Sequence, residues 1–299
     1  MHTNNILITG NYRSGTEYLS NLLNGISNVT SEMYATNFLR YYHKSNSITE
    51  FKEMIATHLY KRKNITLPFE ISNKLIHQHD LSSFMSQLYF YLSPLDKVFI
   101  DKEQLAWKNF DFYKNIFPSG KLIIVVRDPR AVMNSFRKFT THIGDYYLTS
   151  CLNSLGLFQF IEQNVYAHDT IVVKYEDLMT NSKETIFKIC QFLNVPCQEI
   201  VSHEAPKLLN NKVWRGNTTL RGLFNFENSN NCWKTELNSH DIRLVDLICG
   251  KYYSKYGYSE FDDGHVDFQI STNNFSEWVA DQFDYYYRTD NGICKFPLE

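Results

Sequence analysis

One segment near the start of the chain constrains the fold more than any other. Residues 6–19, ILITGNYRSGTEYL, begin with apolar branched residues and continue through a short turn that contains Gly10 and Gly15. This pattern predicts a buried strand, a tight glycine turn and a helix that begins at Thr16. Because a helix N-terminus attracts negative charge and presents backbone N–H groups, the turn predicts a binding site for an anion such as phosphate.

The side chains of this turn indicate what kind of phosphate chemistry is compatible with it. A magnesium-dependent nucleotide kinase would carry lysine and then serine or threonine after Gly15, whereas this chain has Thr16 and Glu17. The cation comes earlier, as Arg13, whose guanidinium can bind a phosphate through two parallel hydrogen bonds. A carboxylate at position 17 would be unfavourable beside a bound anion unless it points away. A strand, turn and helix with a purely structural role remain the alternative.

A second segment repeats the strand-to-helix pattern. Residues 121–136, KLIIVVRDPRAVMNSF, contain an apolar run typical of a central parallel strand buried on both faces. Arg127 follows the run directly, and open α/β sheets bind ligands at the carboxyl ends of their strands. Pro129 suits the start of a helix, where its missing N–H would have no partner. We therefore expect Arg127 and Ser135 to form a second anion site, with an Arg–Asp surface pair and an exposed serine as the alternative.

Together the two segments resemble those of sulfotransferases that use 3′-phosphoadenosine 5′-phosphosulfate (PAPS), especially the branch with RSGT loops that acts on glycans and protein tyrosine. The resemblance implies an α/β fold of the P-loop NTPase-like type, with three layers and a central parallel β-sheet flanked by helices. It implies that the first segment holds the 5′-phosphosulfate and the second the 3′-phosphate. The residues carried over are Arg13, Ser14, Gly15 and Thr16 for the first role and Arg127 and Ser135 for the second.

Four later segments extend the resemblance to residue 237. They are FIDKEQLAW (99–107), IVVKYEDL (171–178), GNTTLRG (216–222) and CWKTEL (232–237). The resemblance implies that Lys102 stabilises charge at the bridging oxygen or the sulfonate, and that other residues line the nucleotide pocket. Those other residues are Tyr175, Arg221 and Lys234, while Trp214 and Trp233 either pack on adenine or belong to the core.

Sulfuryl transfer also needs a base for the acceptor's proton. Glu32 is the leading candidate, because the glycan and tyrosine branches place a catalytic glutamate shortly after the first helix. Glu103 is the rival, since it follows Lys102 at a strand end. The structural alternatives are a surface loop for Glu32 and a salt bridge to Asp101 or Glu103 for Lys102. This chemistry requires no metal, and the HQHD cluster at 77–80 lacks the further ligands of a metal site.

Strand and helix patterns alternate along most of the chain, as in a parallel sheet with crossover helices. We expect a sulfotransferase domain over 1–260, with a helical insertion at about 33–95 that shapes the acceptor cleft, and a packed extension over 261–299. The predicted strands are 5–10, 97–101, 121–126 and 170–175, the predicted helices are 16–24, 182–194 and 238–256, and loops are predicted for 25–32 and 206–232.

Composition limits the partners and the compartment. The 299 residues carry a formal net charge of −2, which gives no general attraction to nucleic acid. No apolar run is long enough to span a bilayer, and no signal peptide precedes the first strand. The six cysteines show no paired spacing and indicate a reducing compartment. A cytoplasmic location is therefore expected, and the oligomeric state is left open.

Three functions follow from these patterns. The first is a PAPS-dependent sulfotransferase that acts on a hydroxyl acceptor, foremost a saccharide, with peptide tyrosine or a small metabolite behind it, and releases adenosine 3′,5′-bisphosphate (PAP). The second is an atypical P-loop nucleotide kinase, which would need the missing lysine and a magnesium site. The third is a nucleotide-binding module that has lost catalysis, for which Glu17 is the hint.

Overall fold

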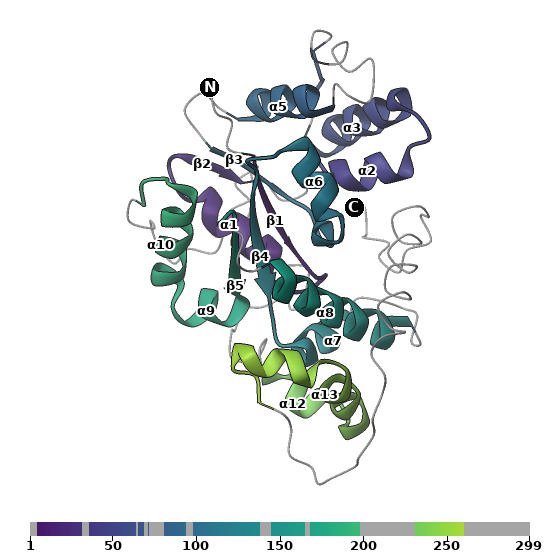
Figure 1. The fold of residues 1–299 in the computed structure, drawn as a ribbon, viewed down its shortest axis with the longest axis vertical. Coiled ribbons are helices and arrows are strands. Elements are labelled where there is room, and N and C mark those ends of the chain that lie inside the picture. Colours follow the sequence, from purple (N-terminus) through teal and green to yellow (C-terminus); the bar gives the residue numbers. More distant parts are fainter. Residues whose placement is uncertain are drawn as a thin grey trace.

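The chain forms a five-stranded parallel sheet with helices on both faces (Figure 1). The computed structural model describes residues 5–31, 36–63, 65–68, 71, 81–93, 98–137, 145–164, 168–197 and 231–259. The strands lie in the order β2-β3-β1-β4-β5. Their bounds are β1 Ile6–Gly10, β2 Val29–Ser31, β3 Val98–Lys102, β4 Lys121–Val126 and β5 Thr170–Lys174. The expected three-layer fold with a central parallel sheet is confirmed.

The helices follow the strands in alternation. Their bounds are α1 Thr16–Asn24, α2 Phe38–Lys44, α3 Ile48–Lys63, α5 Leu81–Leu92, α6 Phe110–Ile116, α7 Pro129–Arg137, α8 Asp145–Asn164, α9 Tyr175–Thr180, α10 Ser182–Leu193, α12 Trp233–Glu236 and α13 Ser239–Tyr253, with short 3-10 turns η2 Ala106–Asn109 and η3 Ser254–Tyr256. None of the helices in the described ranges combines the length and the apolar character that a bilayer span requires.

Strand alternation separates the core into two layers. In β1 and β3, odd-numbered side chains such as Leu7 and Phe99 pack with α5 to α8, whereas even-numbered ones such as Ile8 and Ile100 pack with α1, α9 and α10. In β4 the numbering is reversed, with even-numbered side chains on the α5 to α8 face. Figure 1 shows these two groups of helices on opposite sides of the sheet. Lys102 ends β3 on the even face, so strand geometry directs its side chain toward α1.

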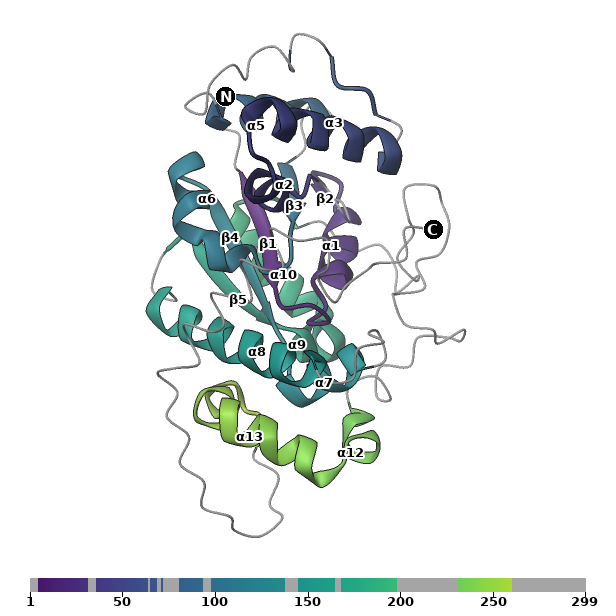
Figure 2. The ribbon, with the colours of Figure 1, turned by 90° about the vertical axis from the view of Figure 1, so that its right-hand side faces the viewer.

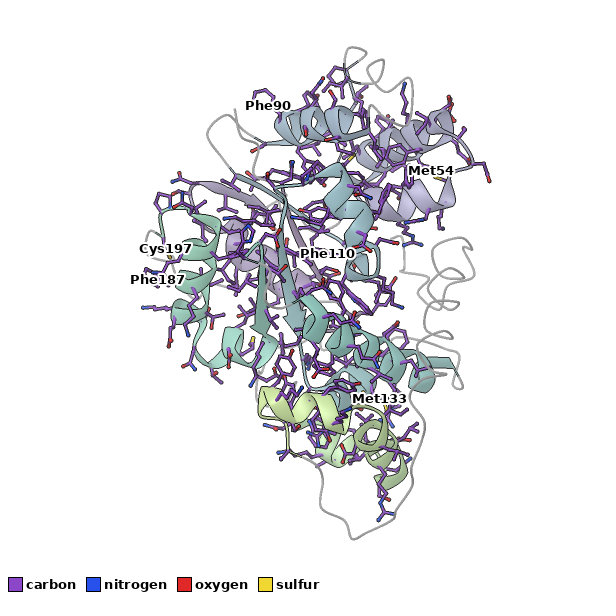
Figure 3. All side chains as sticks on the ribbon, in the orientation of Figure 1. Met54, Phe90, Phe110, Met133, Phe187 and Cys197 are labelled. Carbon is purple, nitrogen blue, oxygen red and sulfur yellow. The ribbon has the colours of Figure 1, made fainter. Side chains whose placement is uncertain are left out.

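Two helical groups flank the sheet at its two ends. In both views α2, α3 and α5 lie at one end of the molecule, and α12 and α13 lie beyond α7 and α8 at the other end (Figures 1 and 2). Met133 of α7 is fully buried and lies beside the C-terminal helices (Figure 3). Arg130 joins α7 to these helices, because its guanidinium lies 4.2 Å from the Trp233 ring of α12 and pairs with Asp246 of α13 at 3.5 Å.

The sequence predicted most of these elements closely, with two differences. The chain after α1 was expected to be irregular, but Val29–Ser31 forms the edge strand β2, which pairs with β3. The strand predicted over 170–175 is one residue shorter, because β5 ends at Lys174 and Tyr175 begins α9. The predicted loop over 206–232 lies mostly outside the described residues, and the extension over 261–299 lies wholly outside them.

Candidate active site

The carboxyl ends of β3, β1 and β4 bring several of the predicted site residues together. These strands are neighbours in the sheet, with Gly10 of β1 opposite Val125 of β4 and Ile8 opposite Lys102 of β3. From β1 the chain passes to the edge strand β2 and then to β3 on one side of β1, and from β3 it crosses to β4 on the other side, so the strand order reverses here. Ligands of open α/β sheets bind at such a switch point.

The glycine turn after β1 forms a cradle at the N-terminus of α1. Gly15 has φ +96° and Arg13 has φ +66°, so two residues of the turn adopt the left-handed conformation. Ser14 closes the turn, because its hydroxyl donates to the Asn11 carbonyl oxygen at 2.8 Å. Ser14 and Thr16 are buried. The turn therefore directs the first backbone N–H groups of α1 toward one point, as an anion site requires.

The second segment contacts this cradle directly. Arg13 Nε donates to Ser135 Oγ on α7 at 2.9 Å, and Arg127 Nη1 donates to the Arg13 carbonyl oxygen at 2.9 Å. Two segments far apart in sequence thus share one hydrogen-bond network. Arg13, expected at the 5′-phosphosulfate, has its side chain on the Ser135 side of the turn. The guanidinium groups of Arg13 and Arg127 concentrate positive charge there.

Tyr175 supports both arginine segments. The Arg127 guanidinium lies 4.5 Å from the centre of its ring, which is within the range of a cation–π contact. The same ring packs on Gly15, where an added Cβ would lie 2.2 Å from Tyr175 Cδ2. Tyr175 is buried and begins α9, directly after β5. It therefore fixes the relative position of the cradle and Arg127.

Lys102 is completely buried and lies beside the first turn of α1. Its Nζ is 3.8 Å from Glu17 Oε1, and the Glu17 side chain is 10% exposed. Burial lowers the pKa of Lys102, while the charges of Glu17, Asp101 and Glu103 oppose that shift. Lys102 thus forms an ion pair with Glu17. The structural role predicted from the sequence was a salt bridge to Asp101 or Glu103. Glu17 points at this lysine.

Glu103 lies at the N-terminal end of α2. Its two carboxylate oxygens accept the backbone N–H groups of Leu39 at 3.2 Å and Arg40 at 2.7 Å, in the first turn of α2. Burial, together with the charge of Asp101, raises the pKa of Glu103 to about 8, and the two backbone hydrogen bonds oppose the shift. This carboxyl group caps α2.

Other predicted residues lie at the margin of the site or outside the described ranges. Glu32 and Arg221 lie outside them, as do Trp214 and the cluster at 77–80. Lys234 is exposed on α12, with its Nζ 5.7 Å from the Trp233 ring. Trp233 is buried against Arg130, which favours the core reading for this ring. Within the described residues, no group of three metal-binding side chains comes together.

Glu176 is a supporting residue that the sequence did not single out. Its Oε1 accepts the backbone N–H of Asp128 at 3.1 Å, and its Oε2 accepts the hydroxyl of Tyr258 at 2.7 Å. It therefore ties the turn after β4 to the chain that follows α13. Its place next to Tyr175 in the YEDL segment was the available signal, because that segment follows a strand at the same sheet edge.

Comparison with known proteins matches this site to one family. The model of a family described as the sulfotransferase family matches residues 5–199, which include the glycine turn, Lys102, Arg127, Ser135 and Tyr175. Protein-tyrosine sulfotransferase 1 of Danio rerio is 28% identical over 109 residues, or 34% of this chain and 31% of that protein. Protein-tyrosine sulfotransferase A of Caenorhabditis elegans is 24% identical over 130 residues, or 41% of this chain and 34% of that protein. The chain thus matches about a third of the length of these relatives.

Solved structures share the fold. The sulfotransferase domain from the curacin biosynthetic pathway has a TM-score of 0.58 at 19% identity, over 86% of this chain and 99% of that one. A mouse sulfotransferase complexed with PAP has a TM-score of 0.50 at 13% identity, over 94% of this chain and 90% of that one. At these identities the likeness concerns the fold.

Proposed function

Because the chain belongs to the sulfotransferase family, we propose that it transfers a sulfuryl group from PAPS to a hydroxyl group. One observation carries the proposal: Arg13, Ser135 and Arg127 form a single hydrogen-bond network around a glycine turn at a helix N-terminus. Two guanidinium groups beside such a turn suit a ligand with phosphate groups at both ends of a nucleoside.

The described residues fit the donor by their chemistry. Gly15 has no Cβ, so the Tyr175 ring can pack directly on its backbone and hold the turn in the conformation that presents N–H groups to a phosphate. In the proposal, Ser14, Gly15 and Thr16 bind the 5′ end of PAPS together with Arg13, and Arg127 and Ser135 bind the 3′-phosphate. Tyr175 keeps Arg127 in place through its ring. Lys234 and Arg221 are proposed as outer contacts of the nucleotide.

Lys102 is proposed to stabilise charge during transfer. PAPS supplies the sulfuryl group, and negative charge develops on the phosphate that departs. A buried ammonium group beside the cradle stabilises that charge more strongly than one in water, because the surrounding dielectric is low. Lys102 is completely buried and lies next to the first turn of α1, the place that this role requires.

In this proposal, Glu32 is the general base that takes the proton of the acceptor hydroxyl group. Its rival Glu103 already uses both carboxylate oxygens to cap α2, and reaching an acceptor would break those hydrogen bonds. Glu32 directly follows β2, which pairs with β3 and so ends near Lys102. A general base must lie within hydrogen-bond reach of the proton that it takes.

The acceptor is proposed to be a hydroxyl group of a saccharide or of a peptide tyrosine. The saccharide was the first expectation from the sequence. The two curated relatives are both named protein-tyrosine sulfotransferases, which adds weight to the tyrosine alternative. In the proposal, α2, α3 and α5 line the acceptor side, and a screen of oligosaccharides and tyrosine peptides with radiolabelled PAPS separates the two classes.

The first test is a calorimetric titration of the purified chain with PAP, with magnesium–ATP as the comparison. We expect micromolar or tighter binding of PAP in the presence of a chelator, because arginine and backbone N–H groups bind phosphate without a metal. A preference for magnesium–ATP would replace the proposal with a kinase. Binding of neither nucleotide would indicate a module without this activity.

A pair of variants tests the assignment of the base. Glu32→Gln should lower turnover roughly 100-fold or more and leave PAP binding unchanged, because it removes a proton acceptor and no nucleotide contact. Glu103→Gln should instead lower the thermal midpoint, since an amide offers one acceptor oxygen to α2 where the carboxylate offers two. Full activity of the Glu32 variant, with activity lost in a folded Glu103 variant, would move the base to Glu103.

A further inference from the structure

Glu17 occupies a position in the cradle that the proposed donor chemistry does not explain. It is the second residue of α1, directly after Thr16, and so belongs to the helix end that is proposed to bind the donor's phosphate. A carboxylate there repels a bound anion. Yet Glu17 is 8% exposed and points toward Lys102, at 3.8 Å.

Two other acidic groups near Lys102, Asp101 and Glu103, form hydrogen bonds elsewhere. Asp101 and Glu103 flank it in the chain, but alternation sends their side chains to the opposite face of the sheet. Asp101 accepts hydrogen bonds from the Thr36 hydroxyl at 2.5 Å and the Tyr89 hydroxyl at 2.7 Å. Glu103 caps α2. Among these acidic groups of the described residues, Glu17 is the one that lies on the α1 face with Lys102.

A buried lysine beside a glycine turn needs a nearby counter-charge to remain protonated. Burial penalises the charged form of an ammonium group, and an opposite charge within about 4–6 Å favours it. Three acidic groups act in this sense on Lys102: Glu17 from α1, and Asp101 and Glu103 from its own segment. Glu17 has the largest effect of the three.

We propose that Glu17 is a positioning residue, which keeps Lys102 charged and directed at the glycine turn before the donor binds. The carboxylate weakens the binding of the donor's phosphate. It also keeps the ammonium group protonated, so that Lys102 can stabilise the negative charge that develops on the departing phosphate. Glu17 acts through Lys102 and does not itself touch the reacting atoms. The ion pair stands on the geometry alone, whereas its catalytic use rests on the proposed function.

A stability cycle tests the ion pair without any assay of activity. Lys102→Met and Glu17→Gln should each lower the thermal midpoint, by roughly 5–10 °C for the lysine variant, because each leaves a charge or a polar group buried without its counterpart. The double variant should recover most of that loss. The matched control is Glu184→Gln with Lys188→Met, an exposed ion pair on α10, where little change and simple additivity are expected.

Binding and pH profiles test the role toward the donor. At pH 6.5, Glu17→Gln should bind PAP roughly fivefold more tightly, since a repelling charge is gone. The pH at which turnover falls on the alkaline side of its pH profile (the basic limb) should be lower by about one pH unit, because Lys102 loses its proton more readily. Glu17→Asp keeps the charge and should restore the limb toward that of the unmodified chain.

The outcomes separate this inference from the proposed function. Additive losses in the stability cycle would overturn the ion pair. If the double variant recovers stability as expected, but Glu17→Gln has an unchanged basic limb and an unchanged PAP affinity, the positioning role would be overturned. If the unmodified chain binds no PAP, the proposed function fails, and the positioning role fails with it, while the stability cycle still decides whether Glu17 and Lys102 are coupled. If the lysine variant does not fold, Glu17→Gln and the double variant still measure the recovery.

Discussion

Gly15→Ala should lower the free energy of unfolding by about 3 kcal/mol or more and weaken PAP binding at least roughly tenfold. Two costs add at this position. A φ of +96° is one that a residue with a Cβ rarely adopts, and the new Cβ would lie 2.2 Å from Tyr175 Cδ2. The ring cannot yield easily, because it is buried and lies against Arg127. Urea unfolding and PAP titration measure the two effects.

Gly257 provides the matched control for this prediction. It also has a positive φ, +77°, but the nearest atom to an added Cβ is the flexible Lys174 Nζ at 3.8 Å. Gly257→Ala should therefore show the backbone cost alone, about 1 kcal/mol, with no effect on PAP binding. The difference between the two variants isolates the contact with Tyr175. Equal losses in both would mean that the ring moves away without cost.

Most of the fold could be predicted from local sequence patterns, because the central strands are strongly apolar. β4 presents an apolar run that is buried on both faces, and glycine turns and Pro129 mark where elements begin. The edge strand β2 escaped such reasoning for a physical reason. Val29–Ser31 is only three residues long and pairs on one side with β3, so it exists through tertiary pairing and leaves no periodic signal.

The site was only partly predictable for a related reason. Arg13, Arg127 and Ser135 follow strands that end at one sheet edge, so sequence alone could bring them together. The ion pair between Lys102 and Glu17 could not be found this way, because Asp101 and Glu103 are the chain neighbours of Lys102, while Glu17 comes from α1, which is distant in sequence and packs on the face of β3 where Lys102 lies. Strand alternation decides against the neighbours. Choosing between Glu17 and these neighbours requires knowing on which face of β3 the Lys102 side chain lies, and the sequence does not give that face.

Arg127→Ala should weaken the binding of PAP by about 2 kcal/mol or more, which is roughly 30-fold. The side chain is 8% exposed, and its guanidinium spans from the Arg13 carbonyl oxygen to the face of Tyr175. Removing it takes a charge-assisted contact from the proposed 3′-phosphate site and releases the glycine turn from that hydrogen bond. Calorimetric titration gives the affinity, and a thermal melt shows whether the variant is folded.

Two further variants separate charge from geometry at this position. Arg127→Lys keeps the positive charge but loses the planar fork and much of the contact with Tyr175, so its affinity should lie between those of the alanine variant and the unmodified chain. Lys251→Ala removes one positive charge from the exposed surface of α13 and should leave PAP binding unchanged. An alanine variant that folds and binds PAP normally would place the 3′-phosphate elsewhere. Arg13 and Ser135, which already share a hydrogen bond, would then be the next residues to replace.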